Sequence, residues 1–233
     1  MAKAVIKKVG KRMEAQNAKL DAGRVYTQEE VVALALDTSA VKFDASVEVH
    51  FRLGIDPKKG DQQIRGTVTL PHGSGKTKRV IAFVDEGKEQ EAKDAGADIV
   101  GDIQMIAEIA QKKNIDFDVA VSTPTMMPKL GKIAQILGPK GLMPNPKTDT
   151  VGKDIAKMIN EQKGGKIAFK NDATSNVHVA IGKVSFGANK IAEHLTIIVD
   201  AIKRAKPATA KGIYVKSATI TTSMGPGIRF SVE

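Results

Sequence analysis

One short run of residues has the composition of a nucleotide phosphate-binding loop. Gly73-Ser-Gly-Lys-Thr77 matches the glycine-rich end of such a loop, in which backbone N–H groups and a lysine hold phosphates. The loop should lead from a strand into a helix, because the helix N-terminus then faces the phosphate. Here Lys78 and Arg79 lead into the apolar run that begins at Val80, which has the pattern of a strand. We therefore interpret the run as a glycine-rich connection, and a nucleotide-binding α/β enzyme stays the alternative function.

Histidines, carboxylates and cysteines indicate no catalytic or metal site. The four histidines, His50, His72, His178 and His194, show no metal-ligand spacing. His50 and His178 fall in strand patterns, where a hydrogen-bonded structural role is the favoured interpretation. The chain has no cysteine, which excludes thiol nucleophiles, thiolate metal sites and disulfides. We therefore predict no enzyme, no cofactor, no metal and no small-molecule substrate.

A hydroxyl-rich stretch near the C-terminus fits contact with structured RNA. Its sequence is Thr219-Ile-Thr-Thr-Ser-Met-Gly-Pro-Gly-Ile-Arg229, and Gly225 in it would let the backbone approach a ligand closely. RNA read by shape, phosphates and 2′-hydroxyls needs Ser, Thr, Lys and Arg on rigid strands. The chain has few aromatic side chains for a platform that stacks single-stranded bases, since only 4% of its residues are aromatic. The structural alternative is a strand that ends in a Gly-Pro turn.

The charge of the chain is concentrated at its two ends. The formal net charge is +10, but residues 67–159 hold 13 Lys/Arg against 12 Asp/Glu. Residues 1–66 hold 12 against 9, and residues 160–233 hold 11 against 5. Such asymmetry favours a surface that meets nucleic acid, and the alternative is a basic protein with solvated lysines.

The middle segment has the pattern of a small parallel α/β domain. Short apolar runs that fit strands buried on both faces occur at Val80–Val84, Ile99–Val100 and Val119–Val121. Helical patterns follow them: the first ends at Gly96, the second is capped by Asp102, and the third has an apolar stripe from Met127 to Leu137. This alternation predicts a doubly wound sheet, although the first strand is not followed by G-x-G-x-x-G.

The flanking segments have an α+β pattern. A basic helix is expected from Ala4 to Leu20, and a capping box, Thr27-x-x-Glu30, opens a second helix. Apolar and polar residues alternate over Val47–Leu53, which predicts a strand, and Ile64–Leu70 is its expected partner. Further strands are predicted at Ile167–Phe169, Val177–Ile181 and Ile213–Val215, with a helix that carries Ile191, Leu195, Ile198 and Ile202. Neither half has enough strands for its own core. We therefore predict one discontinuous domain of residues 1–66 and 160–233, with residues 67–159 as an inserted domain.

The sequence does not predict export or membrane insertion. The N-terminus lacks the apolar core of a signal peptide, and no stretch approaches the roughly 18 apolar residues of a membrane span. We expect a cytoplasmic protein.

Several long motifs resemble the L-one family of large-subunit ribosomal proteins, in its bacterial branch. The resemblance covers essentially the whole chain, in order. It is carried by Lys42-Phe-Asp-Ala-Ser-Val-Glu-Val49, Leu53-Gly-Ile-Asp-Pro57, Arg65-Gly-Thr-Val68, Gly138-Pro-Lys-Gly-Leu-Met-Pro-Asn-Pro-Lys147 and Ser223-Met-Gly-Pro-Gly-Ile-Arg229. One departure is Ser223, where the family usually has Thr, so the hydroxyl is kept and a methyl contact is lost.

The resemblance implies a discontinuous α+β RNA-binding domain, an inserted Rossmann-like domain and a place on the large ribosomal subunit. Its implied partners are the mobile stalk of large-subunit ribosomal RNA near the tRNA exit site, the exit-site tRNA, and the protein's own operon mRNA, whose translation it would repress. The free protein is expected to be a monomer.

The implied RNA contacts fall at both chain ends. The family contacts carry over to Lys42, Phe43, Ser46, Glu48, Ser223, Met224 and Gly225. We expect Lys42, Lys166, Lys170 and Arg229 to neutralise phosphates. Arg52, Lys58 and Lys59 form a second basic strip predicted to face tRNA. The loop at residues 138–146 is predicted to shape a domain contact or to be a structural turn.

Overall fold

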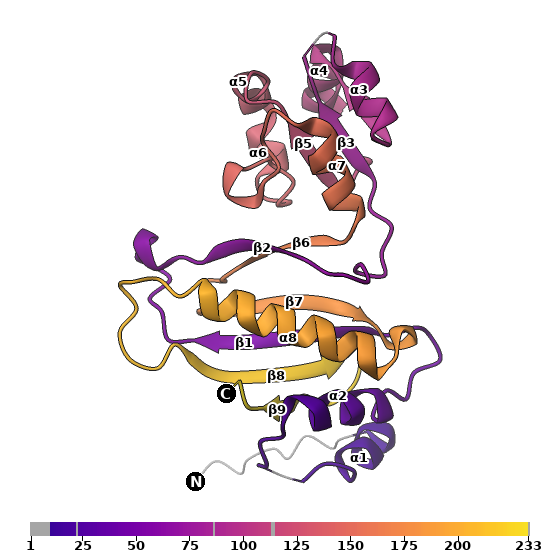
Figure 1. Cartoon of the computed structure of the whole chain (residues 1–233), viewed down its shortest axis with the longest axis vertical. Coiled ribbons are helices and arrows are strands. Elements are labelled where there is room, and N and C mark those ends of the chain that lie inside the picture. The colour runs from indigo at the N-terminus through magenta and orange to yellow at the C-terminus, as the bar shows by residue number, and fades with distance from the viewer. Residues whose placement is uncertain (1–9, 22, 86, 113–114, 233) are drawn as a thin grey trace. The chain divides into compact units, whose positions relative to one another are not determined.

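The chain folds into two compact units (Figure 1). The computed structural model describes residues 10–21, 23–85, 87–112 and 115–232. Unit 1 takes residues 1–64 and 169–233, and unit 2 takes residues 65–168. The mixed α/β fold class predicted from the sequence is confirmed. Within the described residues, none of the helices combines the length and apolar character that crossing a membrane requires.

Unit 1 is built on a four-stranded antiparallel sheet of order β7-β1-β8-β9. Its strands are β1 (Ser46–Leu53), β7 (Asn176–Lys183), β8 (Val215–Thr222) and β9 (Ile228–Phe230). Alternate residues of β1, among them Val47, Val49 and Phe51, are fully buried, as the sequence pattern predicts. The predicted partner of β1 was wrong, because β1 pairs with β7 and β8 on its two edges. Those strands supply alternating apolar residues to the same buried face.

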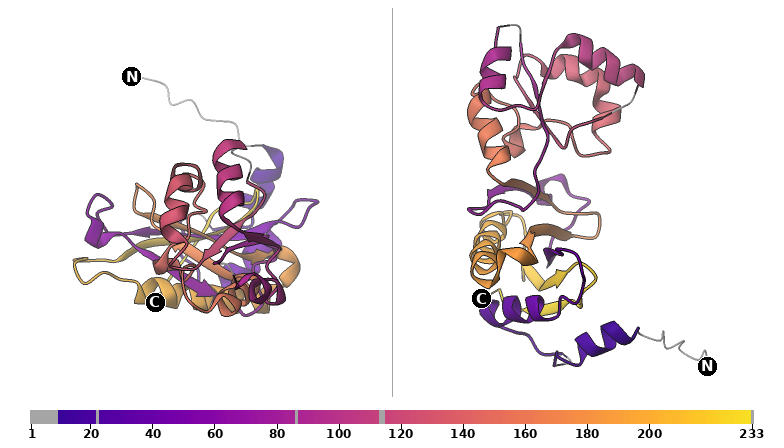
Figure 2. Two further views of the ribbon diagram at one scale, coloured as in Figure 1. Left: turned by 90° about the horizontal axis from the view of Figure 1, so that it is seen from above. Right: turned by 90° about the vertical axis from the view of Figure 1, so that its right-hand side faces the viewer.

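One face of this sheet is covered by helices. Figure 2 shows α2 (Gln28–Asp37) and α8 (Ala188–Arg204) on the same side of the strands. The predicted capping box opens α2, since Thr27 Oγ1 accepts from Glu30 N at 3.3 Å and Thr27 N donates to Glu30 at 3.1 Å. The expected N-terminal helix is shorter, α1 (Lys11–Asn17), and residues 4–9 of that prediction lie outside the described residues. The opposite face of the sheet carries the polar residues of each strand.

Unit 2 contains the predicted parallel sheet, of order β4-β3-β5, with helices on both faces. Its strands are β3 (Val80–Phe83), β4 (Ile99–Gly101) and β5 (Val119–Ser122), and a two-stranded ribbon joins β2 (Arg65–Thr69) to β6 (Lys166–Lys170). Ile81 and Phe83 pack in one apolar cluster with α4 (Ile103–Lys112), while Val80 and Ala82 pack in another with α3 (Glu89–Asp94). Both faces are therefore buried, which explains the continuous apolar strand pattern.

One helix of unit 2 differs from the sequence prediction, and one predicted domain boundary falls inside a helix. The expected helix over Met127–Leu137 is divided into α5 (Met127–Leu130), a 3₁₀ turn (Gly131–Ile133) and α6 (Ala134–Leu137). The predicted apolar stripe survives, because Leu130, Ile133 and Leu137 are fully buried. The boundary predicted after residue 159 falls inside α7 (Ile155–Lys163), whose Ile155 and Ile159 pack against β3 and β5.

Four 3₁₀ turns complete the described elements: η1 (Gly60–Gln62), η2 (Gly131–Ile133), η3 (Pro146–Thr148) and η4 (Val184–Phe186).

Candidate nucleic-acid interface

The start of β1 and the end of β8 form a hydrogen-bonded corner in unit 1. Ser223 N donates to Ser46 O at 3.0 Å, and Ser46 N donates to Ser223 Oγ at 3.2 Å. The Ser223 hydroxyl therefore helps to hold the two strands together. Its own proton has only a long bond, 3.5 Å, to Ser46 O, which leaves it available to a ligand.

The turn after β8 presents Met224 to solvent. Met224 adopts a left-handed backbone with φ 65°, and the residue is 63% exposed. Gly225 N donates to Thr222 O at 2.8 Å, and a Cβ on Gly225 would overlap Thr222 Oγ1 and lie 3.2 Å from Thr222 O. Only glycine fits this position without a shift of the turn. Arg12 of α1 donates from Nη2 to Met224 O at 3.2 Å, a contact that the sequence did not predict.

The loop before β1 exposes Lys42 and an aromatic ring. Phe43 is 57% exposed, an unusual state for a large apolar side chain. The next residue, Asp44, fixes the loop: its carboxylate accepts from Ser185 N at 3.0 Å and from Ser185 Oγ at 2.8 Å. The backbone hydrogen bond from Ser185 is the main reason why the pKa of Asp44 lies below its ordinary value. The loop thus holds Phe43 at the same end of the sheet as Ser46.

The sheet face that no helix covers carries further polar and charged residues next to Ser46. Glu48 is paired with Thr221 of β8, and the next outward residue of β1, His50, is paired with Thr219. Arg229 of β9 is paired with Thr219 in turn. With strands about 4.8 Å apart, Arg229 lies two strands, or roughly 10 Å, from His50. The structure therefore brings the predicted residues Glu48 and Arg229 onto one face with Ser46.

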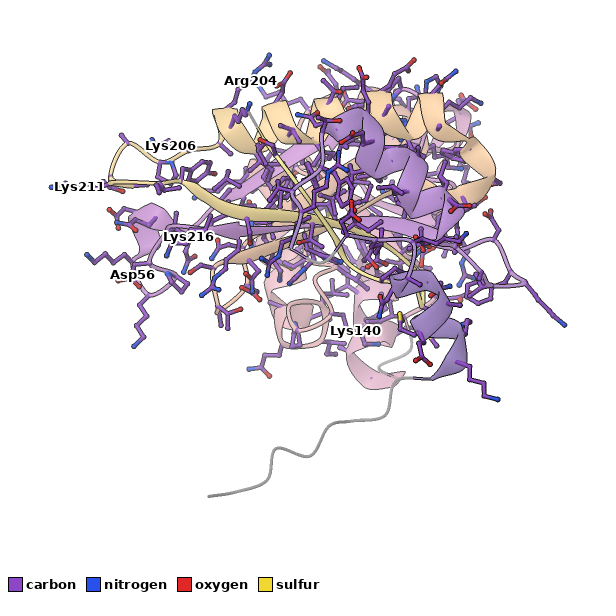
Figure 3. All side chains as sticks on the ribbon, turned by 90° about the horizontal axis from the view of Figure 1, so that it is seen from below. Asp56, Lys140, Arg204, Lys206, Lys211 and Lys216 are labelled. Atoms are coloured by element: carbon purple, nitrogen blue, oxygen red, sulfur yellow. The ribbon has the colours of Figure 1, made fainter. Side chains whose placement is uncertain are left out.

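A second basic group lies at the other end of the sheet. Arg52 is exposed near the end of β1, and Lys58 and Lys59 are exposed in the following loop. Because β1 has eight residues, this end is about 24 Å from Ser46. Figure 3 shows Lys206, Lys211 and Lys216 near Asp56 at this end, and all three lysines are exposed. The sequence analysis did not single out these three lysines.

The loops that carry this second group are joined by hydrogen bonds. Asp56 N donates to Gln62 Oε1 at 2.8 Å, and Gln62 Nε2 donates to Thr209 O at 3.4 Å. Lys170 is also exposed, and the neighbouring Asn171 N donates to Ile64 O at 3.1 Å. Since Asn171 bridges to Val177 near the start of β7, Lys170 belongs to this end of the sheet and not to the end that carries Ser46.

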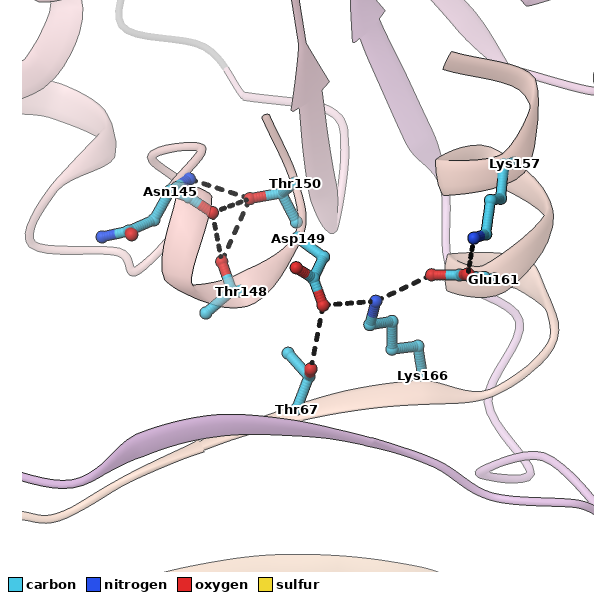
Figure 4. Close-up of polar contacts among 8 residues, drawn as sticks. All are labelled: Thr67, Asn145, Thr148, Asp149, Thr150, Lys157, Glu161 and Lys166. Atoms are coloured by element: carbon cyan, nitrogen blue, oxygen red, sulfur yellow. Dashed lines mark hydrogen bonds and ion pairs between the residues drawn. The ribbon is translucent and has the colours of Figure 1, made fainter. Parts of the chain in front are cut away.

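Lys166 does not fit the predicted phosphate contact. It belongs to unit 2, and its side chain is only 7% exposed. Its Nζ lies 2.7 Å from Glu161 Oε2 and 3.0 Å from Asp149 Oδ2, and Thr67 Oγ1 donates to the same Asp149 oxygen at 3.4 Å (Figure 4). Burial opposes the charge of Lys166, but the hydrogen bonds to Glu161 and Asp149 outweigh burial and raise its pKa. Its charge is already neutralised by these two carboxylates, so the structure does not support Lys166 as a phosphate contact.

Among the described residues of unit 2, the features of a nucleotide-binding enzyme are not brought together. Residues 73–77 lead into β3 without a helix, as the sequence indicates. At the carboxyl ends of β3 and β5, where such folds bind ligands, the Asp85 carboxylate accepts from Thr123 Oγ1 at 3.2 Å and from Thr125 Oγ1. A carboxylate at this position would repel a phosphate group. A cavity of about 210 Å³ lies instead near the amino ends of the strands, lined mainly by Ile81, Ile99, Met105, Ile109 and Phe117.

The histidines have structural partners. His194 is buried, with Nδ1 2.6 Å from Ile181 O. His50 and His178 face each other across β1 and β7, with their Nδ1 atoms 2.8 Å apart. Among the described residues, no three His, Cys, Asp or Glu side chains form a group that could hold a metal ion.

Acid should destabilise unit 1 through His50. Burial, and then the charge of His178, lower the pKa of His50, while Glu48 raises it. The folded state therefore binds the His50 proton less readily than the unfolded state, whose pKa is about 6.5, so stability is lost as pH falls below that value. We expect the free energy of unfolding, measured by urea titration on both sides of this pH, to fall less in His50→Gln than in the parent. Equal losses would show that other groups control the acid response.

Comparison with known proteins identifies the family to which the chain belongs. Residues 35–226 match the Ribosomal protein L1p/L10e family. The chain is 52% identical over 223 residues to the large ribosomal subunit protein uL1 of Kitasatospora aureofaciens, covering 95% of this chain and 92% of that protein. It is also 52% identical to uL1 of Chloroflexus aggregans (strain MD-66 / DSM 9485), covering 95% and 94%. The chain therefore belongs to the bacterial branch of the ribosomal protein L1 family, whose members are structural proteins of the ribosome and not enzymes.

Proposed function

We propose that unit 1 binds large-subunit ribosomal RNA at the mobile stalk near the tRNA exit site. The specific part of this site is the Ser46 corner, defined as Ser46, Ser223, Met224 and Gly225 with the adjacent Phe43. The observation that carries the proposal is the left-handed turn that exposes Met224 beside two hydrogen-bonded serines. The large-subunit names of the relatives support a ribosomal partner.

The corner offers several kinds of short-range contact. Ser223 can donate its proton to a ribose hydroxyl, while Phe43 and Met224 can pack on sugars or bases. Glu48 is placed to accept from a ribose hydroxyl or a base amino group on the uncovered sheet face. Lys42 and Arg229 supply positive charge for phosphates, and Lys170 does so at the other end of unit 1. A rigid surface of this kind reads the shape of a folded RNA.

We extend the proposal to two further partners. The second basic group, from Arg52 through Lys58 and Lys59, is proposed to face exit-site tRNA, supported by the exposed lysines that join it at positions 206, 211 and 216. The Ser46 corner is proposed to bind a similar structure in the protein's own operon mRNA and so to repress its translation. The free protein is proposed to be a monomer.

Replacing Met224 tests the specific site. Met224→Ala should weaken binding to the stalk RNA about tenfold, because losing the packing of a large apolar side chain costs about 1.4 kcal/mol or more. Binding to an unrelated RNA duplex of equal length should hardly change. Fluorescence anisotropy with the full chain measures both affinities. Ile213→Ala is the matched control, since Ile213 is 76% exposed at the other end of unit 1. Equal losses on both RNAs, or no loss on either, would refute a specific role for the turn.

A further inference from the structure

The fold brings two histidines into direct contact on the uncovered sheet face of unit 1. His50 of β1 and His178 of β7 are 128 residues apart in the sequence, but they are directly opposite each other in the antiparallel pairing of these strands. Their Nδ1 atoms are 2.8 Å apart. The Ser46 corner does not include these two residues, so the proposed function assigns the pair no role.

The pair is open to solvent and stands on a firmly packed strand. The His178 side chain is 55% exposed, and His50 is partly exposed. The residues on either side of His50, Val49 and Phe51, are fully buried in the core of unit 1. β1 is also a central strand, with a neighbour on each edge. The two imidazoles are therefore held next to each other where a dissolved ion can reach them.

A fixed carboxylate lies behind one of the two rings. His178 Nε2 is 3.6 Å from Asp172 Oδ2, which is an ion-pair distance. Asp172 accepts from Thr174 Oγ1 and from Asn176 N, each at 2.7 Å, and the bond from the Thr174 hydroxyl is the main reason why the pKa of Asp172 falls to about 2. The ionised carboxylate favours the proton of His178 on Nε2. That tautomer leaves the lone pair of His178 on Nδ1, the atom that contacts His50.

The short distance between the nitrogens limits which ions fit the pair. Bonds from a metal ion to imidazole nitrogen are about 2.0–2.1 Å long. Two nitrogens 2.8 Å apart then subtend an angle of about 85–90° at the ion, after a small rotation of each ring aims both lone pairs at it. Angles near 90° occur in square-planar and octahedral complexes, which Cu²⁺ and Ni²⁺ form. A tetrahedral Zn²⁺ would need nitrogens about 3.4 Å apart.

The charged neighbours of the pair favour a cation. Glu48 precedes His50 by two residues, so both side chains leave the same face of β1, and Asp172 lies beside His178. Arg52 follows His50 by two residues and has the opposite charge. Two carboxylates outweigh one guanidinium, so the local charge attracts a divalent cation to the pair.

We propose that His50 and His178 form a site for a divalent transition-metal ion that takes two imidazoles at adjacent positions, Ni²⁺ or Cu²⁺. The protein supplies two ligands, Nδ1 of each ring, and water fills the other positions. The proton that the two rings share in the free pair moves to Nε2 of His50, so both rings stay neutral. The site does not depend on RNA binding by unit 1.

Isothermal titration calorimetry of the full chain with NiCl₂ tests the site. We expect one Ni²⁺ per chain, bound more tightly than Zn²⁺ in a parallel titration. His50→Gln and His178→Gln should each weaken Ni²⁺ binding about tenfold or more, because each removes one of two ligands and even the loss of an outer partner costs about 10–100-fold. His72→Gln is the matched control, since His72 is an exposed histidine of unit 2, and it should bind Ni²⁺ as the parent does.

Two results of the calorimetry would overturn the proposal. Equal Ni²⁺ affinity in the parent and in both pair variants would show that the ion binds elsewhere on the chain. Tighter binding of Zn²⁺ than of Ni²⁺ would show that the rings do not take an ion at adjacent positions.

A second measurement uses only the parent, in which the pair is intact. Because the ion binds the folded pair, NiCl₂ should raise the free energy of unfolding in a urea titration. The absence of any rise would also refute the site, whatever the stability of the variants.

Discussion

Gly225→Val should abolish most of the preference for stalk RNA. A Cβ at this position overlaps Thr222 Oγ1, and Thr222 is buried, so the turn itself must move. That movement displaces Met224 and disturbs the Ser46–Ser223 hydrogen bonds together. Losing two or three contacts, each worth about 1 kcal/mol, weakens binding by about 100-fold. Anisotropy titrations with stalk RNA and with an unrelated duplex give the preference directly.

The control for this variant is Gly227→Ala in the same turn. A Cβ on Gly227 would meet only the Thr219 methyl group, at 3.2 Å, a contact that a small adjustment relieves. We expect this variant to keep most of the affinity for stalk RNA. Thermal unfolding of both variants checks that unit 1 stays folded. If Gly225→Val binds stalk RNA as tightly as the parent does, the turn is outside the RNA site.

Local sequence patterns predicted the elements of this fold well. The capping box at Thr27, the alternation of Val47 to Leu53 and the strand at Val80 depend on residues close in the chain, so their periodicity and composition were sufficient. The pairing of β1 could not be predicted in the same way. Residues 65–69 read as a strand, but only Val68 is buried, so β2 has no apolar face to add to the β1 sheet. Which strand joins which edge depends on long-range packing.

The residues of the candidate site were likewise predicted only where short sequence motifs identify them. The motifs at residues 42–49 and 223–229 are far apart in sequence, and their resemblance to a known family indicated that both meet RNA. Contacts made only by folding were missed, because nothing local to Arg12 indicates a bond to Met224 O. Lys166 is the opposite case, because the sequence predicted an RNA contact that the folded structure does not support. A lysine that begins a strand resembles an RNA contact until its two carboxylate partners, from α7 and the loop after η3, are known.

The two ion pairs of Lys166 lead to a second prediction, which concerns the stability of unit 2. Lys166→Met should destabilise unit 2 by about 2–3 kcal/mol, because it leaves Asp149 and Glu161 without their shared cation. The loss should fall below that of a fully buried pair, since Asp149 is 63% exposed and Glu161 is 31% exposed. Urea titration followed by circular dichroism measures the change in the free energy of unfolding.

Lys163→Met is the matched control for this change. Lys163 also forms an ion pair, 3.1 Å from Asp98, but both side chains are more than a third exposed, so its loss should cost about 1 kcal/mol or less. Stalk RNA affinity and its salt slope should stay at parent values in Lys166→Met, measured where the variant remains folded. A lysine that touches a phosphate would instead lower the slope by about one unit. A lower slope with unchanged stability would restore Lys166 to the RNA surface and show that its ion pairs open when RNA binds.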